Sequence, residues 1–133
     1  FEPSAIKEKA DFESIAASDI IKFSGENVQD VSFVNNYKDK LFIQTLGSEG
    51  LRFNLRGEGW VNLPPVENGN VMDWEGAGDW TTSAFLNALA ESEALSIKRL
   101  TSEVVKKALE SAQIVASKSV SYIGSKGMIC KNY

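Results

Sequence analysis

The chain has 133 residues, of which 43% are hydrophobic and 24% are charged, as in an ordinary globular domain rather than a disordered segment. Its 18 acidic and 14 basic residues give a net charge of −4, which argues against the basic surface of a nucleic-acid-binding protein. It contains no His and one Cys, which excludes His-activated nucleophiles, His-containing zinc sites and disulfide scaffolds. Any acid–base chemistry must therefore use carboxylates, Lys or Tyr.

No apolar run approaches the roughly 20 residues of a membrane-spanning helix. The first residues also lack the basic and then apolar pattern of a signal peptide. We therefore expect a cytoplasmic protein that binds neither membranes nor nucleic acid. Because the sequence begins at Phe1 rather than at Met, we also expect the chain to be part of a longer protein.

The first third of the chain alternates between helix-like and strand-like segments. Residues 1–18 carry apolar side chains at near-helical spacing and predict a short helix. The compact apolar run 19–23 predicts a buried strand. Residues 26–37 predict a second helix, although their β-branched content weakens it. Residues 40–46 predict another strand, which ends in a glycine-flanked turn.

The rest of the chain contains a hairpin followed by helices. Residues 51–55 and 60–63 both alternate between apolar and polar residues, which predicts an antiparallel hairpin that ends before Pro64. Apolar residues then recur at helical spacing from Trp80, so a helix should begin at Ala77 or Gly78. Residues 96–120 predict one or two more helices with a stripe of small apolar side chains. Together these elements predict an α/β fold.

The start of that helix, Gly76-Ala77-Gly78-Asp79, is the most informative segment. Unshielded N–H groups at the positive end of a helix dipole form an anion site, for which phosphate is the natural ligand. Asp79 lies in the first turn, where the dipole favours its ionised form. A carboxylate beside an anion site suits phosphoryl transfer to an alcohol. The competing interpretation is structural, because glycine is common at helix starts and Asp is a common capping residue.

The wider motif Asp73-x-x-Gly76-Ala77-Gly78-Asp79, with the upstream turn Thr45-Leu46-Gly47-Ser48-Glu49-Gly50, resembles the second signature of the ribokinase-like (PfkB) carbohydrate kinases. Residues 1–3 and 19–27 are also similar to segments of that family, so the resemblance covers nearly the whole chain. It implies a three-layer α/β/α ribokinase-like sandwich. Residues 1–133 would form its C-terminal, ATP-binding half as a single partial domain.

The resemblance also implies roles for individual residues. Asp79 matches the catalytic base that takes the proton of the sugar hydroxyl, and the anion hole is matched by Gly76, Ala77 and Gly78. The turn that packs on the nucleotide is matched by Thr45, Gly47, Ser48 and Gly50. The residues implied near the adenine are Ala112, Gln113 and Ala116.

The implied cofactors are ATP and Mg²⁺, and K⁺ is a further candidate. The residues implied for a monovalent cation are Asp73, Glu75, Ser119 and Gly124. The magnesium region would contain Glu26 and Asn27. Two departures from the family pattern are evident: its Asn-x-x-Glu motif reads Ser24-Gly25-Glu26-Asn27, and two usual threonines are replaced by Trp74 and Glu75.

The resemblance implies that the intact protein is a PfkB-type carbohydrate kinase that uses ATP to phosphorylate a hydroxyl of a sugar or related small alcohol. The isolated chain is expected to be inactive, because the half that binds the acceptor is absent. The alternative is a non-catalytic module that binds nucleotide or a partner, which the departures at Asn27 and Trp74 favour. An exposed sheet edge further predicts a homodimer. Trp60 and Trp80 are expected to serve in packing; the alternative for Trp80, which is next to Asp79, is that it faces the substrate.

Overall fold

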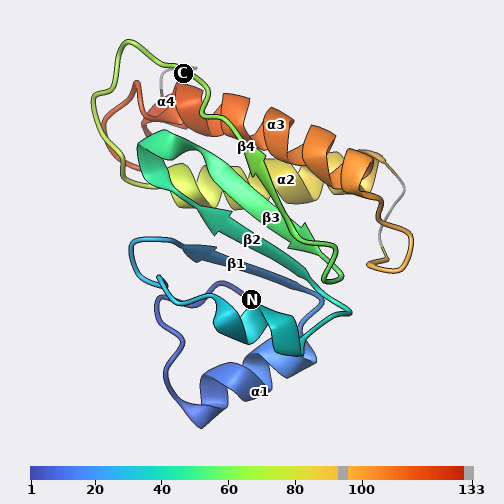
Figure 1. The fold of residues 1–133 in the computed structure, drawn as a ribbon. Helices are drawn as coiled ribbons and strands as arrows, with labels where there is room; N and C mark the ends of the chain where they lie inside the picture. Colours follow the sequence, from blue (N-terminus) through green and yellow to red (C-terminus); the bar gives the residue numbers. More distant parts are fainter. Residues whose placement is uncertain (93–95, 131–133) are drawn as a thin grey trace. The chain divides into compact units, whose positions relative to one another are not determined.

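The computed structural model describes residues 1–92 and 96–130 (Figure 1). They divide into two compact units: residues 1–64 with 96–99 form the first, and the other described residues form the second. The first unit carries the sheet, and the second carries the two longest helices. The expected α/β fold with an antiparallel hairpin is therefore confirmed. None of the helices within the described residues is long and apolar enough to cross a membrane.

A four-stranded mixed sheet organises the first unit, in the order β1-β2-β3-β4. Its strands are β1 (Ile20–Ser24), β2 (Leu41–Thr45), β3 (Leu51–Leu55) and β4 (Trp60–Leu63). β1 pairs with β2 in parallel, whereas β2–β3 and β3–β4 are antiparallel. The β3–β4 pair is the expected hairpin, and it ends at Leu63 because the following Pro64 cannot donate to a ladder.

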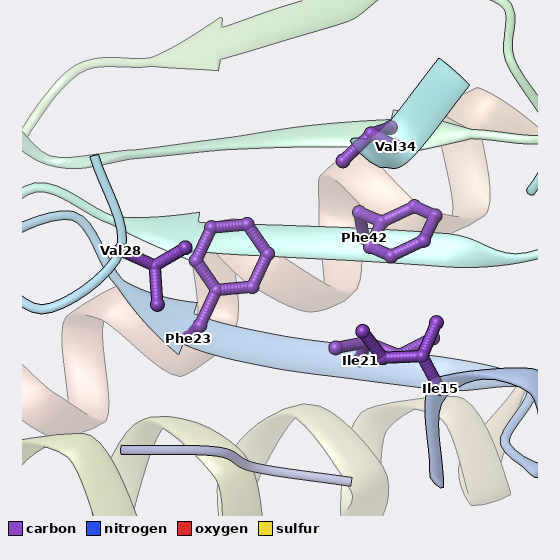
Figure 2. Packing of buried hydrophobic residues seen from close by; sticks show 6 residues of the cluster. All are labelled: Ile15, Ile21, Phe23, Val28, Val34 and Phe42. Atoms are coloured by element: carbon purple, nitrogen blue, oxygen red, sulfur yellow. The ribbon is translucent and has the colours of Figure 1, made fainter. Parts of the chain in front are cut away.

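One face of β1 and β2 carries a cluster of buried hydrophobic residues (Figure 2). Its buried members are Ile15, Ile21, Phe23, Val28, Val34 and Phe42. Ile15 comes from α1 (Lys9–Ala17), and Val34 comes from the 3-10 helix η1 (Ser32–Asn36). The ring of Phe33 lies 5.9 Å from that of Phe23 and 5.8 Å from that of Phe42. α1 and η1 therefore cover this face.

Both ends of α1 are held by side chains. At its start, the Asp11 carboxylate accepts hydrogen bonds from the backbone N–H groups of Lys7 and Glu8, at 2.8 and 2.9 Å. At its end, the buried ammonium of Lys40 donates to the carbonyls of Ala16 and Ser18, at 2.9 and 2.8 Å. Such side chains replace the partners that terminal backbone groups of a helix lack.

The helix expected over residues 26–37 is not formed, and that prediction is wrong. Only η1 is helical in this segment. Polar side chains here bind the backbone instead, because Asp30 Oδ1 accepts from the Ser32 N–H at 2.9 Å. Such local bonds compete with the helical hydrogen-bond ladder. The β-branched residues of the segment add a further cost to helix formation.

The outer edge of β1 is partly occupied by the first residue of the chain. The amino group of Phe1 donates to Ile20 O at 2.9 Å, and Lys22 N donates to Phe1 O at 3.0 Å. Next to this contact, the buried ammonium of Lys22 pairs with the carboxylate of Glu2. Pairing of two copies of the chain at a sheet edge stays a prediction.

The second unit is built around α2 (Ala77–Glu91) and α3 (Ser102–Ser119), which pack against each other (Figure 1). Their buried residues recur at helical spacing, as expected for helices with one buried face. They are Thr81, Phe85 and Leu89 on α2, and Val105, Ala108, Leu109, Ala112 and Ser119 on α3. The short α4 (Gly127–Cys130) follows. The predicted helix start at Ala77 is confirmed.

Candidate functional site

A tight turn leads into α2. The Ala77 N–H donates to Trp74 O at 3.2 Å, which closes the turn. Gly76 has φ +79 and ψ −2, a left-handed conformation that glycine adopts at little cost. The N–H of Ala77 is therefore used within the chain. Ala77 therefore helps to close the turn and has no free N–H group for an anion.

The first turn of α2 has no side-chain cap. In the described part of the chain, the backbone N–H groups of Gly78 and Asp79 have no hydrogen-bond partner. By contrast, α3 is capped by Thr101, whose hydroxyl accepts from Val104 N at 3.2 Å. Asp79 is exposed and lies in the same uncapped turn. The start of α2 thus combines free N–H donors, a helix dipole and a carboxylate.

The segment that follows α3 is tied to the loop ahead of α2. Val120 O accepts from the N–H groups of Met72 and Asp73, at 2.7 and 3.1 Å. The Asp73 carboxylate accepts from Glu75 N at 3.0 Å and from Gly124 N at 2.8 Å. These backbone donors, Glu75 first and then Gly124, lower the pKa of Asp73 below its ordinary value. The structure therefore brings together Asp73 and Gly124, two of the residues that the family resemblance implies for a monovalent cation, and the cation site stays a prediction.

Ser125 lies directly against Gly76. A Cβ atom on Gly76 would sit 2.5 Å from Ser125 Cβ and 2.7 Å from Ser125 Cα. The indole N–H of Trp80 donates to Ser125 O at 2.9 Å. Position 76 therefore requires glycine for two reasons, its positive φ and this close approach. No local sequence signal marks Ser125 as part of the site, because 45 residues separate it from Trp80.

The expected nucleotide turn lies in the first unit, between β2 and β3. It contains the short 3-10 helix η2 (Gly47–Glu49) and is closed by the bond from Leu46 N to Gly50 O, at 2.8 Å. Gly47 and Gly50 have positive φ values of 58 and 92. Ser48 is exposed and Thr45 is half-buried. The turn thus presents exposed backbone at its tip, which a ligand could approach closely.

The loop after β1 adjoins this turn. Gly25 N donates to Thr45 O at 2.8 Å, and a Cβ on Gly47 would lie 4.0 Å from Glu26 Oε1. The structure therefore brings Glu26, from the expected magnesium region, next to the expected nucleotide turn. Asn27 is exposed in the same loop, and its N–H donates to Ser24 O at 3.2 Å.

The residues expected near the adenine lie on α3. Ala112 is fully buried, whereas Gln113 and Ala116 are half-buried. In this structure Ala112 contributes to packing and offers no surface to a ligand. Gln113 and Ala116 are the two of these residues that solvent reaches.

The described residues contain no group of three or more His, Cys, Asp or Glu side chains that could hold a metal ion. Mg²⁺ bound with a nucleotide needs only one or two carboxylates, because phosphates and waters supply its other ligands. The single carboxylate of Glu26 fits that role. For a monovalent cation, Asp73 supplies a carboxylate, and the carbonyls of Ser119 and Gly124 keep a second lone pair beyond their bonds to Tyr122 N and Gly127 N.

Comparisons with known proteins show the family of the chain. A family model described as the pfkB family carbohydrate kinase matches residues 8–130, so the chain belongs to that family. No curated protein sequence matches the chain.

Several solved structures share the fold. Ribokinase from Giardia lamblia has a TM-score of 0.75 and 21% identity, over 94% of this chain and 44% of that chain. Fructokinase from Vibrio cholerae, bound to fructose, ADP and calcium, has a TM-score of 0.71 and 17% identity, over 86% of this chain and 38% of that chain. An uncharacterized sugar kinase from Pyrococcus horikoshii, in complex with ATP, has a TM-score of 0.66 and 30% identity, over 88% of this chain and 36% of that chain. The chain thus spans less than half the length of these proteins.

Proposed function

We propose that the protein containing this chain transfers the γ-phosphoryl group of ATP to a hydroxyl of a sugar or related small alcohol. The observation that carries the proposal is the uncapped start of α2, where the free N–H groups of Gly78 and Asp79 adjoin the exposed Asp79 carboxylate. Membership of the pfkB family supports the same chemistry.

The reaction uses these groups as follows. Asp79 accepts the proton as the acceptor O–H bond breaks, and the acceptor oxygen forms a bond to the γ-phosphorus. The bond from the γ-phosphorus to the β–γ bridging oxygen breaks, and ADP leaves. The N–H groups at the start of α2 stabilise the negative charge on the transferring phosphoryl group, because they point along the positive end of the helix dipole.

The other expected residues take supporting roles in this proposal. The turn of Thr45, Gly47, Ser48 and Gly50 would pack on the nucleotide, and the base would lie near Gln113 and Ala116. Glu26, with Asn27, would hold magnesium, which neutralises phosphate charge when bound. A monovalent cation would be held by Asp73 and Glu75 with carbonyls near Ser119 and Gly124. It would stabilise the loop ahead of α2.

The test is Asp79→Asn in the full-length protein, with Glu91→Gln as the control, because Glu91 is an exposed carboxylate at the other end of α2. Loss of the general base should lower kcat by roughly 100- to 10,000-fold. Affinity for ATP should stay close to that of the wild type, and Glu91→Gln should behave like the wild type. Wild-type turnover by Asp79→Asn, measured on a panel of sugars and nucleosides, would reject the proposal.

A non-catalytic nucleotide-binding module is the second candidate. It is favoured by the loop after β1, where Asn27 stands in place of the family's acid and Glu26 is the only carboxylate among residues 24–28. In that case the full-length protein would bind ATP with magnesium yet phosphorylate no acceptor, and Asp79→Asn would change nothing. The same panel of acceptors therefore separates the two candidates.

A further inference from the structure

Trp80 links the first turn of α2 to the segment that follows α3. Its backbone N–H donates to Gly76 O at 3.0 Å within the helix. Its indole N–H donates to Ser125 O at 2.9 Å. The ring is half-buried, and a half-buried indole normally finds a partner for its single donor. Trp80 therefore binds both Gly76 and Ser125, the two residues that pack against each other at the start of α2.

The contact between Ser125 and Gly76 lies at the turn ahead of α2. Ser125 packs so closely on Gly76 that a Cβ atom there would lie 2.5 Å from Ser125 Cβ. A shift of Ser125 away from α2 would open space at Gly76, and the backbone of the turn could then change its conformation. The hydrogen bonds made by the Asp73 carboxylate and by Val120 O hold the loop ahead of the turn. The bond from the Trp80 indole to Ser125 O instead ties this segment to α2 itself.

We propose that Trp80 is a positioning residue for the start of α2, where its indole N–H holds Ser125 on Gly76 and so fixes the direction of the Gly78 and Asp79 N–H groups. This inference rests on the proposed function. Donors that act on a developing charge must be aligned before the reaction, and misplacement by about 1 Å can cost roughly 100-fold in rate. Trp80 touches neither nucleotide nor acceptor in this role.

The test compares Trp80→Phe with Trp60→Phe in the full-length protein. Both substitutions remove an indole from a half-buried position, but within the described residues the Trp60 indole N–H has no hydrogen-bond partner. Trp80→Phe should lower kcat at least roughly tenfold, while the KM for the acceptor changes less than about twofold. Trp60→Phe should leave both constants unchanged. If Trp80 had only a structural role, Trp80→Phe would lower the amount of folded protein but would not lower kcat selectively over KM.

A second readout does not depend on catalysis. Hydrogen exchange at the Ala77 and Gly124 amides, which donate to Trp74 O and Asp73 Oδ2, should speed up at least roughly tenfold in Trp80→Phe and not in Trp60→Phe. If neither exchange nor kcat changes, the inference is overturned. If exchange changes but the wild type phosphorylates no acceptor, the proposed function fails while the positioning of the turn stands.

Should Trp80→Phe fail to fold, benzothienylalanine at position 80 keeps the shape of the indole and removes only its N–H. The same accelerated exchange at Ala77 and Gly124 is then expected. Wild-type exchange in that protein would show that the ring alone holds the contact, and it would overturn the role of the N–H.

Discussion

Replacing Gly76 with Ala should lower the free energy of unfolding more than replacing Gly124, the other glycine of the second unit with a positive φ. A non-glycine residue in the left-handed conformation costs roughly 1–2 kcal/mol. The new Cβ would also lie 2.5 Å from Ser125 Cβ and 2.7 Å from its Cα, so the backbone must shift. Overpacking of this kind costs roughly a further 1–3 kcal/mol. The total is a large share of the roughly 5–15 kcal/mol by which a typical domain is stable.

Gly124→Ala is the matched control, because it isolates the steric part of this cost. Gly124 has φ +75, close to the +79 of Gly76, yet a Cβ there would meet nothing within 4 Å. Urea unfolding followed by circular dichroism should therefore show Gly76→Ala to be less stable than Gly124→Ala by about 1–3 kcal/mol. Equal losses in the two variants would refute the close approach of Ser125 to Gly76.

Two further predictions concern α1. Lys40→Met removes the buried ammonium that holds the carbonyls of Ala16 and Ser18, and it should lower the free energy of unfolding by about 2–3 kcal/mol. Lys9→Met, at an exposed position, should change it by less than about 0.5 kcal/mol. Asp11→Asn should lower the unfolding midpoint at pH 7, because backbone donors of Lys7 and Glu8 lower the pKa of Asp11. A lowered pKa stabilises the fold only while the group is ionised, so this difference should shrink as the pH falls below about 4 and vanish below the lowered pKa of folded Asp11; a pH-independent difference would contradict it.

The features that the sequence predicts correctly depend on local patterns. Alternating residues in 51–55 and 60–63 give the β3–β4 hairpin, because the period of a strand is two. The glycines before Asp79 mark the start of α2, because only glycine adopts the φ of position 76 easily.

Other features depend on contacts that no local pattern encodes. Residues 26–37 have apolar residues at plausible helical spacing, yet Asp30 caps the N–H of Ser32 and the helix does not form. The Trp80–Ser125 bond joins residues 45 positions apart, so the sequence alone does not predict it. Likewise, Ala112 is buried by tertiary packing, which composition alone does not reveal.

A phosphate site at the start of α2 can be tested by calorimetric titration of the full-length protein with a non-hydrolysable ATP analogue and magnesium. Wild-type protein is compared with Gly78→Ala and Gly78→Leu, since Gly78 is exposed in the uncapped turn of α2. We predict binding by the wild type, a modest weakening in Gly78→Ala and at least roughly a tenfold weakening in Gly78→Leu, because the larger side chain shields the free N–H groups. Equal affinity in all three proteins would contradict a phosphate site at the start of α2.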